Sequence, residues 1–294
     1  MVTDCIGVLG AASPVGQQVI RLLRERGCSV VGFSREPQKD VAGVIWVNTS
    51  DPKGIDNLLG EGVTRISRWI CVLHIWLLPQ YFNVLRELGA CRLVCISSTS
   101  RYTKSVSSNI YEERLVAKLI EGENNATQWA EDYGVDWTII RPTLIYGRGN
   151  DRNLSEIVRL IKRWHFFPLF GGGRGLRQPV YVDDVAKACI ATLDNDRTIN
   201  KAYNISGADA LTYRQMVEKV FIALGHKPRF VFINLNLFKL ALFFLRLIPR
   251  YRGWNASMVE RMVVDMVFDY SAAKEDFNFC PQQFRLDSQD VEIN

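Results

Sequence analysis

Apolar runs alternate with helical patterns over the first two thirds of this chain. The first apolar run spans residues 5–9, and a second, at 29–33, follows a stretch in which apolar side chains recur at helical spacing. Later apolar runs lie at 44–47, 69–73, 92–97, 136–141 and 178–182, with helical patterns at 52–60, 79–89, 109–133 and 183–193. Strands that are apolar throughout are covered on both faces. The pattern therefore predicts the α/β class, with a doubly wound parallel sheet.

The turn after the first apolar run has the sequence GAASPVG, residues 10–16. Ser13 can cap the following helix, and proline suits a first helical position because its missing N–H needs no partner there. The N-terminus of a helix attracts phosphate, and glycines permit a tight turn and close packing of helix on strand. We therefore expect this loop to bind a dinucleotide pyrophosphate; the alternative is an ordinary strand–turn–helix without a ligand. The expected cofactor-binding residues are Gly10, Ser13, Pro14, Val15, Gly16, Ser34 and Arg35.

The end of the second apolar run favours NADP over NAD. No acidic residue stands at 32–35, where one would bond the ribose 2′-hydroxyl of NAD. Arg35 can instead pair with a 2′-phosphate, and Ser34 can add a hydrogen bond. Glu36 follows directly, so NAD is kept as the alternative.

Residue 150 separates the regular alternation from a looser pattern. We expect residues 1–150 to form a dinucleotide-binding Rossmann domain, with 179–205 returning to it. Residues 151–294 then form mainly a smaller part that covers a substrate. This division places the ligand between the two parts.

Composition narrows the function classes. The chain is 48% hydrophobic and 23% charged with a net charge of +5, and its arginines are scattered, which disfavours nucleic acid as a partner. The seven cysteines contain no CxxC pair and the three histidines lie far apart, so neither a disulfide framework nor a metal site is expected. With no secretory signal, these features predict a reducing, cytoplasmic location. The oligomeric state is left open.

One long apolar segment, residues 230–248, requires a membrane test. Asn234, Asn236, Lys239 and Arg246 interrupt it, and charges near the middle of a bilayer are costly, so a membrane span is disfavoured. We expect a strand that leads into a buried or groove-facing helix. The alternative is peripheral membrane contact through residues 235–252.

Five segments in order resemble the short-chain dehydrogenase/reductases, in the extended branch that contains NAD-dependent epimerases and dehydratases. They are the GAASPVG loop, ISSTSRY at 96–102, WTIIRPTLIYG at 137–147, PVYVDDVA at 179–186 and AYNISG at 202–207. The resemblance implies hydride transfer at a carbinol or carbonyl carbon of a small substrate, with nucleotide-linked substrates among the candidates. Arg174 and Arg177 are candidates to hold such a substrate, or are solvated loop arginines.

The resemblance also assigns catalytic positions. Its Ser-Ser pair ahead of Tyr102 points to Ser98 as the residue that orients the substrate oxygen, unless that serine only bonds local backbone. The family's Tyr-x-x-x-Lys pair is missing, since Val106 and Leu115 follow four residues after the candidate tyrosines Tyr102 and Tyr111. Lys118 lies 23 residues before Arg141, the family's distance, and this places Arg114 where the tyrosine would stand. Lys118 is otherwise a solvated helix lysine.

Two functions remain open from the sequence. The first is an oxidoreductase or epimerase in which Ser98 orients the substrate, Lys118 binds ribose, and Tyr102 or water replaces the lost phenol. The second is a non-catalytic NADP-binding scaffold or redox sensor, which Arg114 in the tyrosine's place favours, because a guanidinium is no general acid near neutrality. The retained strand end and substrate-side motifs favour the enzyme, which is the interpretation we adopt at this stage.

Overall fold

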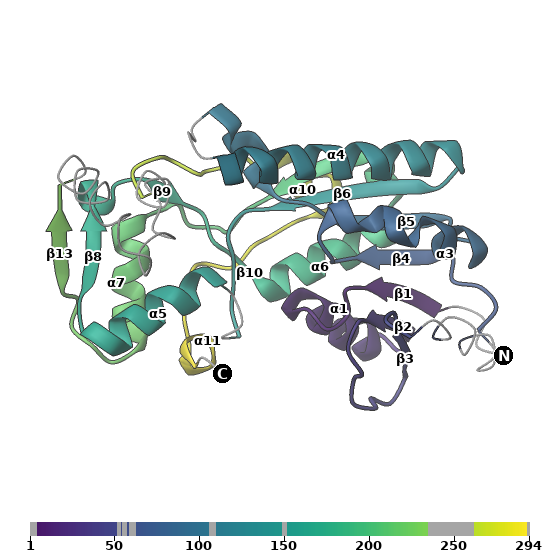
Figure 1. Cartoon of the computed structure of the whole chain (residues 1–294), viewed down its shortest axis with the longest axis horizontal. Coiled ribbons are helices and arrows are strands. Elements are labelled where there is room, and N and C mark those ends of the chain that lie inside the picture. The colour runs from purple at the N-terminus through teal and green to yellow at the C-terminus, as the bar shows by residue number, and fades with distance from the viewer. Residues whose placement is uncertain are drawn as a thin grey trace.

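A seven-stranded parallel sheet forms the centre of the molecule. The computed structural model describes residues 5–51, 54, 58, 63–105, 110–148, 152–234 and 262–292. The strand order is β11-β6-β5-β4-β1-β2-β3 (Figure 1). The strands are β1 (Cys5–Leu9), β2 (Ser29–Ser34), β3 (Val44–Asn48), β4 (Arg68–Cys71), β5 (Arg92–Ile96), β6 (Asp136–Pro142) and β11 (Lys201–Ile205). The predicted fold class is confirmed, and the order reverses between β1 and β4, where doubly wound folds bind ligands.

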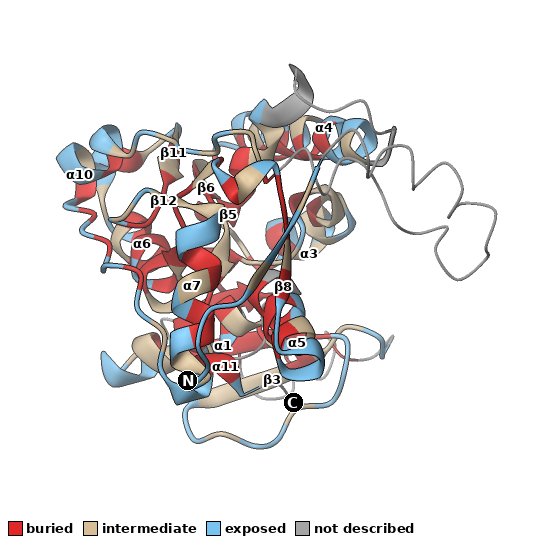
Figure 2. Ribbon diagram, turned by 90° about the vertical axis from the view of Figure 1, so that its left-hand side faces the viewer, coloured by how far each residue is buried: buried red, intermediate tan, exposed pale blue. Residues whose placement is uncertain are grey.

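Helices cover both faces of this sheet. Helices α1 (Pro14–Glu25) and α6 (Val182–Leu193) pack on one face, and η1 (Ile75–Tyr81), α3 (Phe82–Glu87) and α4 (Ile110–Asp132) pack on the other. Successive side chains of a strand point to opposite faces, so Ile6 and Val8 join the α1 core while Cys5 and Leu9 join the α4 core. Both surfaces of the sheet are consequently buried (Figure 2).

The prediction of a central strand at 178–182 was wrong. Only Val180–Tyr181 are extended there, as β10, and they pair with β7 (Ile145–Tyr146) outside the central sheet. Pro179 carries no N–H for a ladder, and α6 already begins at Val182. The last strand of the sheet is instead β11, whose mixed burial is that of a half-covered edge strand and gives no continuous apolar run.

A smaller part with its own core lies at one end of the long axis (Figure 1). It contains α5 (Arg152–Trp164), β8 (Phe167–Phe170), α7 (Tyr213–Ala223), β13 (Phe230–Ile233) and α11 (Ser288–Val291). Its core includes Val158, Ile161, Val217 and Phe221, which are fully buried. By contrast, α10 (Ser271–Phe277) returns to the sheet and packs on β11 and α6.

Several expectations fall partly outside the described residues. Of the predicted helix at 52–60 only Gly54 and Leu58 are described, and both are helical. The segment at 230–248 begins with β13, and the remainder of the proposed membrane contact, 235–252, lies outside the described residues. Across the part of the chain that the structure describes, no helix is long and apolar enough to cross a membrane.

Candidate functional site

The GAASPVG loop joins β1 to α1 in the conformation that its sequence predicts. Gly10 has φ +80°, and a Cβ there would lie 2.8 Å from the Leu73 nitrogen. A Cβ on Gly16 would lie 2.5 Å from the Gly10 carbonyl oxygen. Ser13 is the N-cap of α1, and its Oγ accepts a hydrogen bond from the Gly16 N–H at 3.1 Å, with Pro14 next at the first helical position. The loop is therefore a tight turn at the N-terminus of a helix, as expected.

The end of β2 presents one buried hydroxyl and one exposed cation. Ser34 is 7% exposed, and its Oγ accepts hydrogen bonds from the Glu36 N–H and from Gln38 Nε2, both at 3.2 Å. Arg35 follows with an exposed side chain. The Ser34 hydroxyl keeps its proton for a further acceptor, because both bonds use its lone pairs.

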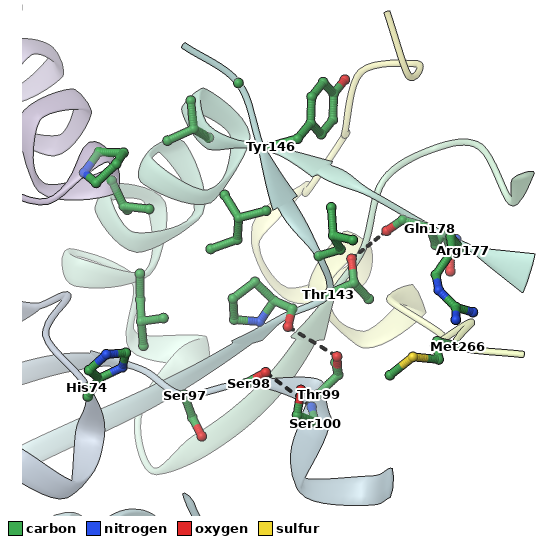
Figure 3. Close-up of a pocket in the computed structure, with 18 of the residues that line it drawn as sticks. His74, Ser97, Ser98, Thr99, Ser100, Thr143, Tyr146, Arg177, Gln178 and Met266 are labelled. Carbon is green, nitrogen blue, oxygen red and sulfur yellow. Dashed lines mark hydrogen bonds between the residues drawn. The ribbon is translucent and has the colours of Figure 1, made fainter. Parts of the chain in front are cut away.

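A cavity of about 650 Å³ lies between the carboxyl ends of the strands and the smaller part. Its sheet side includes Ser13, His74 and the Ser97–Ser100 turn, and its far side includes Arg177 and Met266 (Figure 3). Three predicted cofactor residues (Ser13, Pro14 and Val15) and the predicted catalytic Ser98 line it together. The structure therefore gathers these four at one cavity, and Ser34 and Arg35 are not among its lining residues.

Three hydroxyl side chains follow β5. Ser97 is buried and its Oγ hydrogen-bonds a carboxylate oxygen of Glu123 at 2.5 Å, while Thr99 Oγ1 donates to the Pro142 carbonyl at 3.1 Å. Ser98 lies between them, is half-buried, and its Oγ accepts from the Ser100 N–H at 3.1 Å (Figure 3). Its neighbours fix the turn, so the Ser98 hydroxyl retains a proton that it can donate into the cavity.

Helix α4 turns two leucines toward the cavity. Leu115 and Leu119 line it and lie four residues apart, on one face of the helix. Arg114 and Lys118 are exposed and are not among the lining residues, although Lys118 Nζ lies 5.9 Å from the centroid of the Trp76 ring, which does line the cavity. The face that the cavity meets is therefore displaced by one residue from the face that the sequence comparison indicated.

A buried carboxylate continues the same face of α4. Glu123 lies four residues after Leu119, is 3% exposed, and forms ion pairs with Arg101 and Arg141. Arg141 also donates from Nη1 to the hydroxyl of Tyr102 at 2.9 Å, and burial lowers the pKa of both guanidinium groups. The sequence analysis missed Glu123; its spacing of eight from Leu115 on one helix face was the available signal.

Tyr102, a predicted catalytic residue, lies beside the cavity. Its side chain is 44% exposed, and its ring centroid is 5.8 Å from that of Phe268, a lining residue. Because its hydroxyl accepts from Arg141, that hydroxyl is oriented by a cation and can donate its own proton elsewhere. Tyr102 is thus a neighbour of the site that the Glu123 cluster positions.

Of the two substrate-side arginines, only Arg177 lines the cavity. Arg174 is exposed, whereas Arg177 is 4% exposed. Arg177 Nη1 donates to the carbonyls of Leu176 and Val264 at 2.6 and 2.7 Å, and the guanidinium lies 5.8 Å from the Tyr213 ring centroid. A buried positive charge is therefore fixed in the far wall.

The described residues show no metal centre: no group of three or more His, Cys, Asp or Glu side chains among them could hold a metal ion. All seven cysteines are free thiols, and Cys5, Cys71, Cys95 and Cys189 are buried. Packing in the apolar core raises the pKa of the Cys189 thiol to about 12. A thiol with a raised pKa is a poor nucleophile at neutral pH, so it has the character of a core residue.

Comparison with known proteins gives one family match. Residues 81–206 match the model of the NAD dependent epimerase/dehydratase family. A stretch of 95 residues is 38% identical to NADH dehydrogenase (ubiquinone) 1 alpha subcomplex subunit 9, mitochondrial, of Arabidopsis thaliana, covering 32% of this chain and 23% of that protein. The chain is also 25% identical to 2-alkyl-3-oxoalkanoate reductase of Stenotrophomonas maltophilia, covering 94% of each. The matches span less than two thirds of the lengths of the first three curated relatives.

Solved structures share the fold. The chain superposes on UDP-glucose 4-epimerase of Thermotoga maritima, determined with UDP-glucose, with a TM-score of 0.68 and 17% identity, over 95% of this chain and 94% of that one. At this identity the likeness extends to the architecture alone.

Proposed function

The chain carries a domain of the NAD-dependent epimerase/dehydratase family over residues 81–206, and from that premise we propose that it binds a nicotinamide dinucleotide without efficient turnover. One observation carries the proposal. The face of α4 that meets the cavity presents Leu115 and Leu119, at the same spacing of four as the family's Tyr-x-x-x-Lys pair. We infer that the two leucines occupy the positions of that pair, so α4 supplies neither a phenol nor an ammonium group.

The glycine loop fits a dinucleotide. Gly10 and Gly16 both stand where a Cβ would collide with backbone atoms, so the chain comes as close to a ligand there as its backbone permits. The first N–H groups of α1 have no intrahelical acceptor, and the Ser13 hydroxyl can donate. A bound nicotinamide dinucleotide would supply hydride chemistry; the residues that would hold its pyrophosphate are Gly10, Ser13, Val15 and Gly16.

We further propose NADP(H) as the cofactor. The exposed guanidinium of Arg35 directly follows β2, and Ser34 beside it keeps a donor hydroxyl. A guanidinium forms paired, charge-assisted hydrogen bonds with a phosphate. A ribose without the 2′-phosphate offers Arg35 no such partner.

Arg35→Ala should weaken NADPH binding about tenfold, because exposed charge-assisted hydrogen bonds contribute modestly. NADH affinity should change little. Titration calorimetry with both cofactors measures the two affinities, and Lys39→Ala, which removes an exposed charge four residues later, is the matched control. Equal losses for NADPH and NADH would contradict the assignment.

A slow reductase or epimerase is the second candidate, and Ser98 favours it. Its hydroxyl lines the cavity with a proton free to donate, and Tyr102 lies beside the site with an oriented hydroxyl. Arg177 supplies a buried cation that suits a phosphorylated or nucleotide-linked substrate. Arg114 and Lys118 contribute little to this chemistry in our proposal, because both are exposed outside the lining.

Turnover separates these two candidates. We expect NADPH to bind while reduction or epimerisation of family substrates such as UDP-glucose is slow or absent, since general acid–base catalysis is worth about 10²–10⁴-fold. Ser98→Ala should abolish any residual turnover, followed at 340 nm, and leave NADPH affinity unchanged. Brisk turnover that survives both Ser98→Ala and Lys118→Met would refute this placement of the site.

A further inference from the structure

The half of the cavity farther from the glycine loop has an apolar wall. Four elements of the smaller part and its return segment supply it: α5, β8, α7 and the chain at 262–268. The side chains are Ile157, Leu160, Phe167, Met216, Met266 and Phe268. Since they come from segments far apart in the sequence, the apolar character belongs to the assembled cavity and not to one loop.

Helix α4 and the chain after β6 extend this wall on the opposite side. Leu115 and Leu119 line the cavity from α4, and Leu144 and Ile145 line it from the connection to β7. Leu115 is 39% exposed although it borders a cavity. A ligand chain between the two walls would remove apolar surface from water on both sides, which favours binding.

The polar groups of the same wall are largely engaged with one another. Thr143 Oγ1 donates to the Gln178 carbonyl (Figure 3), and Gln178 Oε1 accepts from the Phe268 N–H at 3.2 Å. Arg177 donates to two main-chain carbonyls. A sugar ring would lose the hydrogen bonds of several hydroxyls with water and find few replacements here, whereas a methylene chain loses none.

We propose that this half of the cavity binds a medium-chain acyl or alkyl group, with the polar end of the ligand toward the Ser98–Ser100 turn. The ligand class rests on the proposed function, because the dinucleotide would take the Ser13 side of the same cavity. The apolar walls from α4, α5 and α7 select the chain, and the hydroxyls after β5 meet its polar end.

The test is a fluorescence titration of the full-length chain with 11-(dansylamino)undecanoic acid. We expect saturable binding with blue-shifted emission, and displacement of the probe by decanoic acid but not by UDP-glucose. Leu115→Gln combined with Leu160→Gln should weaken probe binding about tenfold or more, since two half-exposed wall positions lose apolar surface. Both sites tolerate polar residues because neither is fully buried.

Ile222→Gln is the matched control, since this side chain is 67% exposed on α7 and is not among the lining residues. Its probe affinity should equal that of the unmodified chain. No saturable binding, displacement by UDP-glucose, or an equal loss in Ile222→Gln would overturn the proposal. NADPH titration of the same variants reports on the proposed function separately: absent NADPH binding refutes the cofactor site, while probe binding alone decides the acyl site.

Discussion

Gly10→Val should reduce NADPH affinity by well over about tenfold, the largest binding effect expected from a single substitution here. Gly10 has φ +80°, a conformation that a β-branched residue rarely adopts, and its new Cβ would meet the Leu73 backbone nitrogen at 2.8 Å. The loop would have to shift away from β4, and the Ser13 cap and the first N–H groups of α1 would shift with it. Titration calorimetry at fixed ionic strength measures the loss.

A matched control separates backbone strain from damage to the site. Gly27 ends the same helix with φ +76°, and a Cβ there meets nothing within 4 Å. Gly27→Val therefore carries a similar conformational cost without touching the loop, so it should lower stability while leaving NADPH affinity intact. Equal NADPH affinity for Gly10→Val and the unmodified chain, or no NADPH binding at all, would refute the dinucleotide site.

The glycine loop could be predicted because its determinants are local. The cap at Ser13, the proline after it and the two glycines lie within seven consecutive residues, and each acts through its own backbone conformation. The sheet could also be predicted, because fully covered strands are continuous apolar runs. The edge strand β11 lacks such a run, and the apolar stretch at 178–182 was taken for a central strand instead.

The lining of the cavity could not be predicted in the same way. Counting back from Arg141 led to Arg114 and Lys118, but one residue corresponds to about 100° around a helix, and the cavity meets Leu115 and Leu119 instead. The partners of Glu123 lie on η2 and β6, so only the folded chain brings them together. The apolar wall depends likewise on four separate elements, whose side chains read as ordinary core residues in the sequence.

The Glu123 cluster carries the largest expected effect on stability. Glu123 is 3% exposed and accepts from Ser97, Arg101 and Arg141, while the two arginine side chains are 21% and 15% exposed. Glu123→Leu fills a similar volume but leaves two partly buried guanidinium groups without their carboxylate. Removing one partner of a buried ion pair costs about 3–5 kcal/mol, so we expect a loss of that size in the free energy of unfolding.

Urea unfolding followed by circular dichroism measures this loss, and Glu121→Leu provides the control two residues earlier on the exposed side of α4. Exposed substitutions usually change stability by less than about 0.5 kcal/mol. Glu123→Gln should fall between the two, because its amide oxygen can still accept from Ser97 while the negative charge is gone. If Glu123→Leu unfolds at the same urea concentration as Glu121→Leu, the ion pairs contribute no net stability. The Ser97–Ser98 turn would then owe its position to the Thr99–Pro142 hydrogen bond and to β5 alone.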